Sequence, residues 1–277
     1  MTVAEALRRT ARGLAATSDT ARLDAELLMA HALGVTRSEL LLRHMDEPAP
    51  SRFAQLVERR ERHEPVAYIV GSREFYGREF TVAQGVLIPR MDSETTVAAA
   101  LEAAPAPRRV LDCGVGSGAL LLTVLLERPA AEGVGIDRSA EALEIASGNA
   151  ARLGLAERAR LLQRDWDGPG WADDLGRFDL VLANPPYVEE DAPIAPAVRA
   201  WEPPGALFAG GEGLDAYRVL VPQLPSLLAE NGVAVVEIGA TQADAVGVMA
   251  AAAGFGCELR RDLAGRPRTL VLRSAST

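Results

Sequence analysis

The chain has 277 residues, enough for one large domain or two of ordinary size. Its 48% hydrophobic content is typical of a globular protein with a well-supplied core. The formal net charge of −9 argues against general binding to nucleic-acid backbones, because phosphate binding needs a concentrated basic surface. We therefore expect no direct nucleic-acid partner.

Cysteines, histidines and apolar runs exclude further classes of protein. Cys113 and Cys257 lie far apart in apolar sequence, which predicts two buried free thiols in a reducing compartment. The three histidines have no metal-ligand spacing, so we expect no metal site. The first residues lack the apolar core of a signal peptide, and no apolar run approaches ~18 residues. These features predict a cytoplasmic protein without a membrane span.

Residues 1–63 are predicted to form a helical N-terminal domain. Capping-box spacing, in which a Thr hydroxyl and a Glu carboxylate satisfy free backbone donors, occurs at Thr2–Glu5 and at Thr36–Glu39. Residues 21–34 carry apolar side chains at helical spacing and stop at a glycine. A further amphipathic segment covers residues 51–63.

Residues 64–94 differ in composition from the segment before them and are predicted to form a hairpin and linker. The stretch from 67 to 82 is rich in aromatic and β-branched residues, with turn points at Gly71 and Gly77. A proline-rich loop at 103–109 punctuates the chain beyond this segment.

Residues 95–277 are predicted to form an α/β domain in which strands and helices alternate. Strands are expected at 109–114, 133–137, 159–165, 178–184 and 233–239, and helices from about 118 and 139 and over 215–229 and 241–253. Two last strand-like runs have no helix between them and should pair antiparallel. The alternation predicts right-handed crossovers and a mostly parallel, doubly wound sheet.

A glycine-rich turn follows the first of these strands. Gly114, Gly116 and Gly118 alternate with Val115 and Ser117 between the strand and the next helix. Glycines there allow a tight turn and close approach of the backbone to a ligand. The spacing lacks the longer interval of the dinucleotide fingerprint, so the turn alone also fits a structural role.

Acidic and aromatic residues end the next two strands. Asp137 lies about 20 residues beyond the glycines, where a carboxylate can accept both hydroxyls of a ribose or cap the following helix. Asp165 and Trp166 end the third strand, where they can take an adenine's amino group and flank its ring. An ordinary aromatic lid is the alternative for the indole. Together these strand ends predict an adenosine-containing cofactor.

The sequence Asn184-Pro185-Pro186-Tyr187 ends the fourth strand. With the glycine turn and Asp137, it resembles class I S-adenosylmethionine-dependent methyltransferases acting on a planar nitrogen. Segments 64–77, 87–94, 202–218 and 265–268 extend the match over nearly the whole chain, which resembles the HemK-type protein-(glutamine-N5) methyltransferases.

This resemblance implies a Rossmann-like class I methyltransferase fold, with a mostly parallel sheet and an antiparallel last strand. It implies S-adenosyl-L-methionine as cofactor and S-adenosyl-L-homocysteine as product. The substrate would be the Gln of the Gly-Gly-Gln motif in a peptide chain release factor. We expect a monomer whose N-terminal domain docks that factor, although the domain could instead only shield the cofactor.

The resemblance also implies roles for individual residues. The Asn184 side-chain oxygen and the Pro185 carbonyl would each accept one N–H of the target amide, and Tyr187 would pack against it. The cofactor side would comprise Gly114, Val115, Gly116, Ser117, Gly118, Asp137, Asp165, Trp166 and Asn184. The substrate side would comprise Asn184, Pro185, Pro186, Tyr187, Arg90 and Glu94. A proline-terminated strand with a capping Asn is the structural alternative for this motif.

Other functions fit parts of the sequence. Family enzymes usually have Pro-Arg-Pro-Asp-Thr-Glu where this chain has Met91 and Ser93 at the third and fifth positions of 89–94. That departure keeps open an N-methyltransferase of a small-molecule metabolite. A DNA adenine methyltransferase would need a basic cleft, which the net charge of −9 does not favour. A non-catalytic binding module with this fold would not need Asn184.

Overall fold

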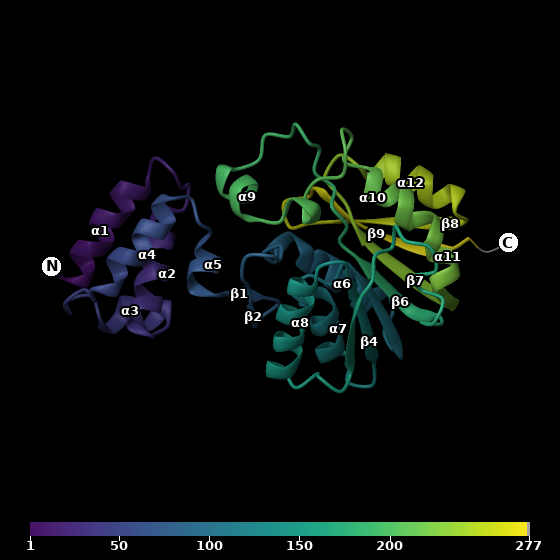
Figure 1. The fold of residues 1–277 in the computed structure, drawn as a ribbon, viewed down its shortest axis with the longest axis horizontal. Coiled ribbons are helices and arrows are strands. Elements are labelled where there is room, and N and C mark those ends of the chain that lie inside the picture. The colour runs from purple at the N-terminus through teal and green to yellow at the C-terminus, as the bar shows by residue number, and fades with distance from the viewer. Residues whose placement is uncertain (276–277) are drawn as a thin grey trace. The chain divides into compact units, whose positions relative to one another are not determined.

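The computed structural model describes residues 1–275 and divides them into two compact units (Figure 1). The helical unit comprises Met1–Ser72 and Ile194–Trp201. The sheet unit comprises Arg73–Pro193 and the chain from Glu202 onward. Within the described residues, every helix is too short or too polar to cross a bilayer.

The helical unit is built around one apolar core to which its first five helices contribute. Its helices are α1 (Val3–Leu14), α2 (Ala21–Leu33), α3 (Arg37–Arg43), α4 (Arg52–Glu61), α5 (Val66–Val70) and α9 (Pro196–Trp201). Both predicted capping boxes are present, at Thr2–Glu5 and Thr36–Glu39. The predicted stop of α2 at Gly34 is also confirmed, because this residue takes φ +73° as its C-cap.

The predicted hairpin begins later than the aromatic stretch indicates. Residues 66–70 form α5 instead, which ends at Gly71 with φ +83°. Burial of Tyr68 and Ile69 outweighs the strand preference of this stretch. The hairpin consists of β1 (Ser72–Phe75) and β2 (Arg78–Thr81), and its two turn residues both have positive φ, as a type I′ turn requires.

The sheet unit contains a seven-stranded sheet in the order β5-β4-β3-β6-β7-β9-β8. Its strands are β3 (Arg109–Cys113), β4 (Glu132–Asp137), β5 (Ala159–Gln163), β6 (Phe178–Ala183), β7 (Leu228–Glu237), β8 (Phe255–Arg261) and β9 (Pro267–Ser274). Strands β3 to β7 pair in parallel, and β9 runs antiparallel to both of its neighbours. The predicted α/β fold with an antiparallel last strand is confirmed.

Helices cover both faces of this sheet. They are α6 (Glu94–Ala103), α7 (Ala119–Glu127), α8 (Ala140–Arg152), α10 (Asp215–Leu220), α11 (Leu224–Leu227) and α12 (Ala243–Ala252), with short 3₁₀ turns η1 (Met91–Ser93), η2 (Pro204–Ala206) and η3 (Val221–Gln223). Helices α6 to α8 cover one face and α10 to α12 the other (Figure 1). Successive residues such as Val110 and Leu111 belong to opposite cores, as strand geometry dictates.

Two predictions for this unit are wrong. The single helix expected over 215–229 is broken into α10, η3 and α11, because Pro222 and Pro225 have no N–H to donate to a continuous helix. The burial expected for Cys257 is also wrong, since this residue lies exposed on the edge strand β8. Cys113, in the central strand β3, is buried as expected.

Candidate active site

The glycine turn and the Asn-Pro-Pro-Tyr sequence directly follow two neighbouring strands of the sheet. Strands β3 and β6 are parallel neighbours, and Cys113 pairs with Ala183. The next residues, Gly114 and Asn184, therefore lie together at the carboxyl edge of the sheet. The strand order reverses at this point, which is where open α/β sheets bind their ligands.

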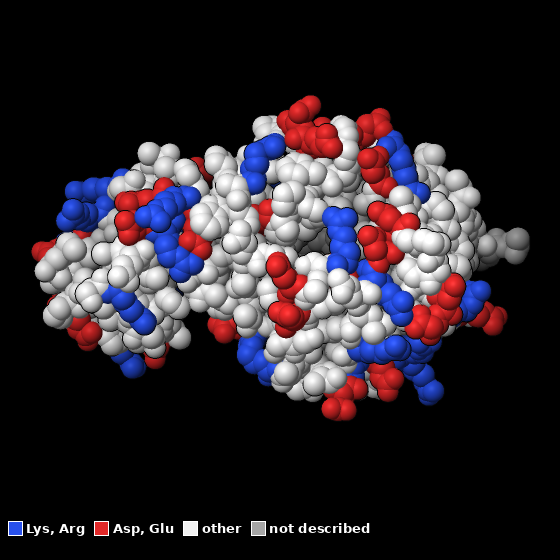
Figure 2. Space-filling model, viewed as in Figure 1, with Lys and Arg blue, Asp and Glu red and all other residues white. Residues whose placement is uncertain are grey.

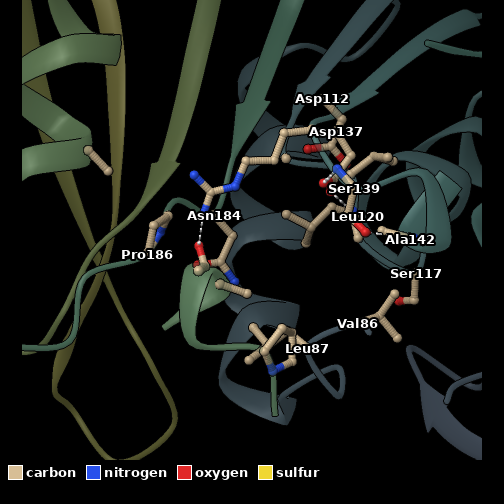
Figure 3. A pocket seen from close by; sticks show the side chains of 18 of the residues that line it. Val86, Leu87, Asp112, Ser117, Leu120, Asp137, Ser139, Ala142, Asn184 and Pro186 are labelled. Atoms are coloured by element: carbon tan, nitrogen blue, oxygen red, sulfur yellow. Dashed lines mark hydrogen bonds between the residues drawn. The ribbon is translucent and has the colours of Figure 1, made fainter. Parts of the chain in front are cut away.

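A cavity of about 590 Å³ lies at this edge. It brings together most of the predicted site residues, namely Arg90, Gly114, Val115, Gly116, Ser117, Asp137, Asp165, Trp166, Asn184 and Pro186. In Figure 3, Asn184 and Pro186 lie on one side of the cavity, and Asp112, Asp137 and Ser139 lie on the other. Gly118, Pro185, Tyr187 and Glu94 do not line it.

The shape of the glycine turn explains its sequence. Gly114 and Gly118 both take φ +86°, a conformation that L side chains rarely adopt. A Cβ on Gly114 would lie 3.1 Å from the Trp166 ring, and one on Gly118 would lie 2.7 Å from Leu122 Cδ1. The positive φ and these close contacts both favour glycine at the two positions, and Gly114 presents bare backbone to the cavity beside the indole.

Asp137 connects the glycine turn to the start of α8. Its Oδ2 accepts a hydrogen bond from Gly116 N at 3.0 Å, and its Oδ1 accepts one from Ser139 N at 2.9 Å. Ser139 itself caps α8 through Ala142 N. Each carboxylate oxygen has a second lone pair, so this helix-end role leaves Asp137 able to accept ribose hydroxyls as well.

Sequence reasoning missed Asp112, a buried carboxylate at the floor of the cavity. It is 1% exposed, and its Oδ2 accepts a hydrogen bond from Leu121 N at 3.2 Å. Its Oδ1 has no hydrogen-bond partner among residues 1–275. Burial, reinforced by the charge of Asp137, raises the pKa of Asp112 to about 7. The available signal was a lone acid inside an apolar strand.

Because the pKa of Asp112 is raised in the folded protein, this residue lowers the free energy of unfolding of the unliganded protein by an amount that depends on pH. The unfolded chain releases this proton near pH 4, whereas the folded protein holds it up to about pH 7, so stability falls as the pH rises through this window. Asp112→Asn should therefore increase the free energy of unfolding at pH 8, by up to about 4 kcal/mol. Urea unfolding measures this gain, which should shrink as the pH falls toward 4; a pH-independent gain would contradict it.

The fourth strand ends with an amide that the protein leaves free. Asn184 is half-buried and lines the cavity, and its side chain has no hydrogen-bond partner within residues 1–275. Pro185 is buried behind it. Tyr187 directs its hydroxyl toward Glu237 and Arg268, neither of which lines the cavity. The free amide is therefore available to a ligand.

The two remaining substrate-side candidates have different positions. Arg90 lines the cavity, and its Nη2 lies 2.6 Å from Oε1 of the buried Glu202. Glu94 contacts the hairpin instead, because its Oε1 accepts a hydrogen bond from Tyr76 N at 2.9 Å. The structure therefore brings Arg90, but not Glu94, to the cavity wall.

The charge of the lining suits a cationic ligand. Six carboxylates line the cavity, from Asp112, Asp137, Glu141, Asp165, Asp167 and Asp215, against the guanidinium groups of Arg90, Arg138 and Arg164. Elsewhere, acidic and basic side chains are interspersed on the face drawn in Figure 2. The cavity therefore favours positive charge, unlike a site for nucleic-acid phosphates.

Comparison with known proteins gives the family. Residues 5–71 match the model of the PrmC N-terminal domain, and residues 107–246 match that of a methyltransferase domain. The release factor glutamine methyltransferase of Cereibacter sphaeroides is 42% identical over 281 residues, which cover 99% of each chain. The chain belongs to the release factor glutamine methyltransferase family. That of Moorella thermoacetica is 41% identical, over 98% of each chain.

A solved methyltransferase structure has a similar fold. A methyltransferase from Pyrococcus furiosus aligns with a TM-score of 0.54 at 14% identity, covering 73% of this chain and 91% of that one. At this identity the likeness concerns the fold alone. The resemblance drawn from the motifs is thus confirmed at the level of fold and family.

This family member's departures from the usual motif lie in η1. Met91 is 66% exposed, so the side chain that replaces a proline points into solvent. Ser93 is buried and lines the cavity. The substitution at 91 therefore leaves the cavity wall intact, and the one at 93 removes only a methyl group from it.

Proposed function

We propose that this protein transfers a methyl group from S-adenosylmethionine to the side-chain amide nitrogen of the Gln in the Gly-Gly-Gln motif of a release factor. The observation that carries the proposal is the free amide of Asn184, next to the glycine turn at the carboxyl edge of the sheet. Family membership supports the same reaction, because the named relatives are release factor glutamine methyltransferases.

The cavity fits the proposed cofactor. S-adenosylmethionine carries a sulfonium and an ammonium group, and it supplies an electrophilic methyl group when bound. The unpartnered Oδ1 of Asp112 offers a buried acceptor for a cationic donor. The backbone of the glycine turn, with Asp137, would hold the ribose, while Asp165 and Trp166 would hold the adenine.

The protein's task in this reaction is orientation. An amide nitrogen is a weak nucleophile because its lone pair is delocalised into the carbonyl, and its proton becomes acidic only as the new N–C bond forms. The Asn184 Oδ1 and the Pro185 carbonyl would each accept one N–H, so that the nitrogen lone pair faces the methyl group. The rings of the two prolines hold φ near −65°, so the backbone at this end of the strand has little freedom to move.

The helical unit is proposed to dock the release factor. A single Gln side chain offers little binding energy, so selecting one Gln in one protein requires contacts remote from the reacting atom. The cavity-lining residues all lie in the sheet unit, which leaves the surface of the helical unit available for such contacts. Because release factors act on ribosomes, this proposal places the protein in the cytoplasm.

A labelled-cofactor assay tests the function directly. Purified release factors, each with its Gly-Gly-Gln motif unmodified, are incubated with the protein and labelled S-adenosylmethionine. Peptide mass mapping should then locate one added methyl group on the Gln of that motif. A protein that binds the cofactor but labels none of the factors would instead indicate a small-molecule substrate.

Asp137→Ala should weaken cofactor binding. The change removes charge-assisted hydrogen bonds to the ribose, each worth at most roughly 1.5–3 kcal/mol. It also frees Gly116 N, so part of the loss comes from a looser glycine turn. Calorimetry with S-adenosylmethionine measures the affinity. Asp137→Asn is the matched control, because it keeps an acceptor for Gly116 N; unaltered affinity in both variants would contradict the assignment.

A further inference from the structure

Tyr187 is held at three points, although it does not line the cavity. Its backbone N donates to Leu207 O at 3.1 Å, and its carbonyl accepts a hydrogen bond from Gln242 Nε2 at 3.1 Å. Its hydroxyl lies 3.5 Å from Glu237 Oε1 and 3.4 Å from Arg268 Nη1. The phenol thus lies between a carboxylate and a guanidinium group.

Both partners of the phenol come from neighbouring strands of the sheet. Glu237 ends β7 and is 1% exposed, and Arg268 lies in the neighbouring strand β9 and is 7% exposed. Thr96 Oγ1 donates to the other carboxylate oxygen of Glu237 at 3.3 Å. Burial and the nearby Glu237 charge raise the pKa of Tyr187 to about 12, so the phenol keeps its proton and acts as a donor.

The position of the Tyr187 ring determines that of Asn184, because the segment 184–187 that joins them is rigid. Only Pro185 and Pro186 separate the two residues, and proline rings fix φ near −65°. The segment 184–187 therefore moves largely as one piece. A shift of the ring would displace the Asn184 amide and the Pro185 carbonyl, and displacements of about 1 Å can slow a reaction by about a hundredfold.

We propose that Glu237 and Arg268 are positioning residues that act through the Tyr187 hydroxyl to aim the amide acceptors of Asn184 and Pro185. This inference rests on the proposed function and adds two residues that the cavity lining alone does not reveal. The hydroxyl of Tyr187 is thereby an internal anchor for the turn at 184–187.

Tyr187→Phe and Glu237→Met test the anchor. Each should lower kcat for methylation of the release factor by about tenfold or more, with the cofactor Kd unchanged. Tyr187→Phe removes the donor and Glu237→Met removes the acceptor of the same contact, so the double variant should be no slower than the slower single variant. Tyr187→Phe deletes one oxygen atom and keeps the packing, so it carries the test even if Glu237→Met does not fold.

Arg266 provides a matched control for Arg268. Both guanidinium groups contact Asp92 and Asp262, but only Arg268 reaches Tyr187. Arg266→Met should therefore keep the wild-type kcat, whereas Arg268→Met should lower it. An active wild-type enzyme with an equally active Tyr187→Phe variant would overturn the positioning role. A wild-type protein that methylates no release factor would instead contradict the proposed function.

Discussion

Asn184→Ala is expected to lower kcat by about 10²–10³-fold while the affinity for S-adenosylmethionine stays nearly unchanged. The variant removes the amide that the fold leaves free at the cavity wall, and it removes no internal hydrogen bond among the described residues. The folded structure should therefore survive. Single-turnover methylation of the release factor measures the rate, and calorimetry measures cofactor binding.

Asn184→Asp serves as the control for this experiment. It keeps an acceptor oxygen at the same place but adds a negative charge near the sulfonium. We expect it to retain more turnover than Asn184→Ala, because the target N–H still finds its acceptor. Near-normal turnover of Asn184→Ala on the release factor would show that another group orients the amide.

Deleting residues 1–63 is expected to abolish recognition of the intact factor while the cofactor still binds. The cavity-lining residues all lie outside the deleted segment. We expect kcat/KM for the release factor to fall by about a hundredfold or more, equivalent to about 2.7 kcal/mol of docking energy. A short peptide with the Gly-Gly-Gln sequence, which is too small to use a remote docking surface, should be methylated equally by the truncated and full-length enzymes.

Comparing the intact release factor with the short peptide distinguishes a helical unit that docks the factor from one that only shields the cofactor. If the helical unit only shields the cofactor, truncation should slow both substrates alike and weaken cofactor binding. Full activity of the truncated enzyme on the intact factor would refute docking. Because Ile194–Trp201 packs with the deleted helices, a second truncation that also replaces this segment with a short Gly/Ser linker controls for its exposure.

Local signals predicted most of the regular elements, and they located the glycine turn, Asp137, Asp165 and Trp166, which line the cavity. Capping boxes, alternating apolar runs and the glycine turn depend on residues close in sequence, so one stretch of chain contains the whole signal. The elements that were predicted wrongly depend on packing or on the chemistry of the backbone. Helix α5 forms because Tyr68 and Ile69 are buried, and the helix after Asp215 breaks at prolines.

The partners of the buried charged side chains could not be predicted either, because they come from distant parts of the chain. Glu202 accepts hydrogen bonds from Ile88 N and from Arg90, which lies 112 residues earlier in the chain. Glu237 and Arg268 meet only because β7 and β9 are neighbours in the sheet. A single sequence shows that these charges interrupt apolar runs, but which group satisfies them depends on the tertiary fold.

The return of the chain to the helical unit at Ile194–Trp201 affects the order of folding during synthesis. Trp201 Nε1 donates to Arg62 O at 3.3 Å, yet the intervening 73–193 belongs to the sheet unit. At about 5–20 residues per second, a ribosome needs about 6–24 s to make that stretch. The nascent helices must wait that long for their last segment, so the helical unit completes its fold only after strand β6 has been made.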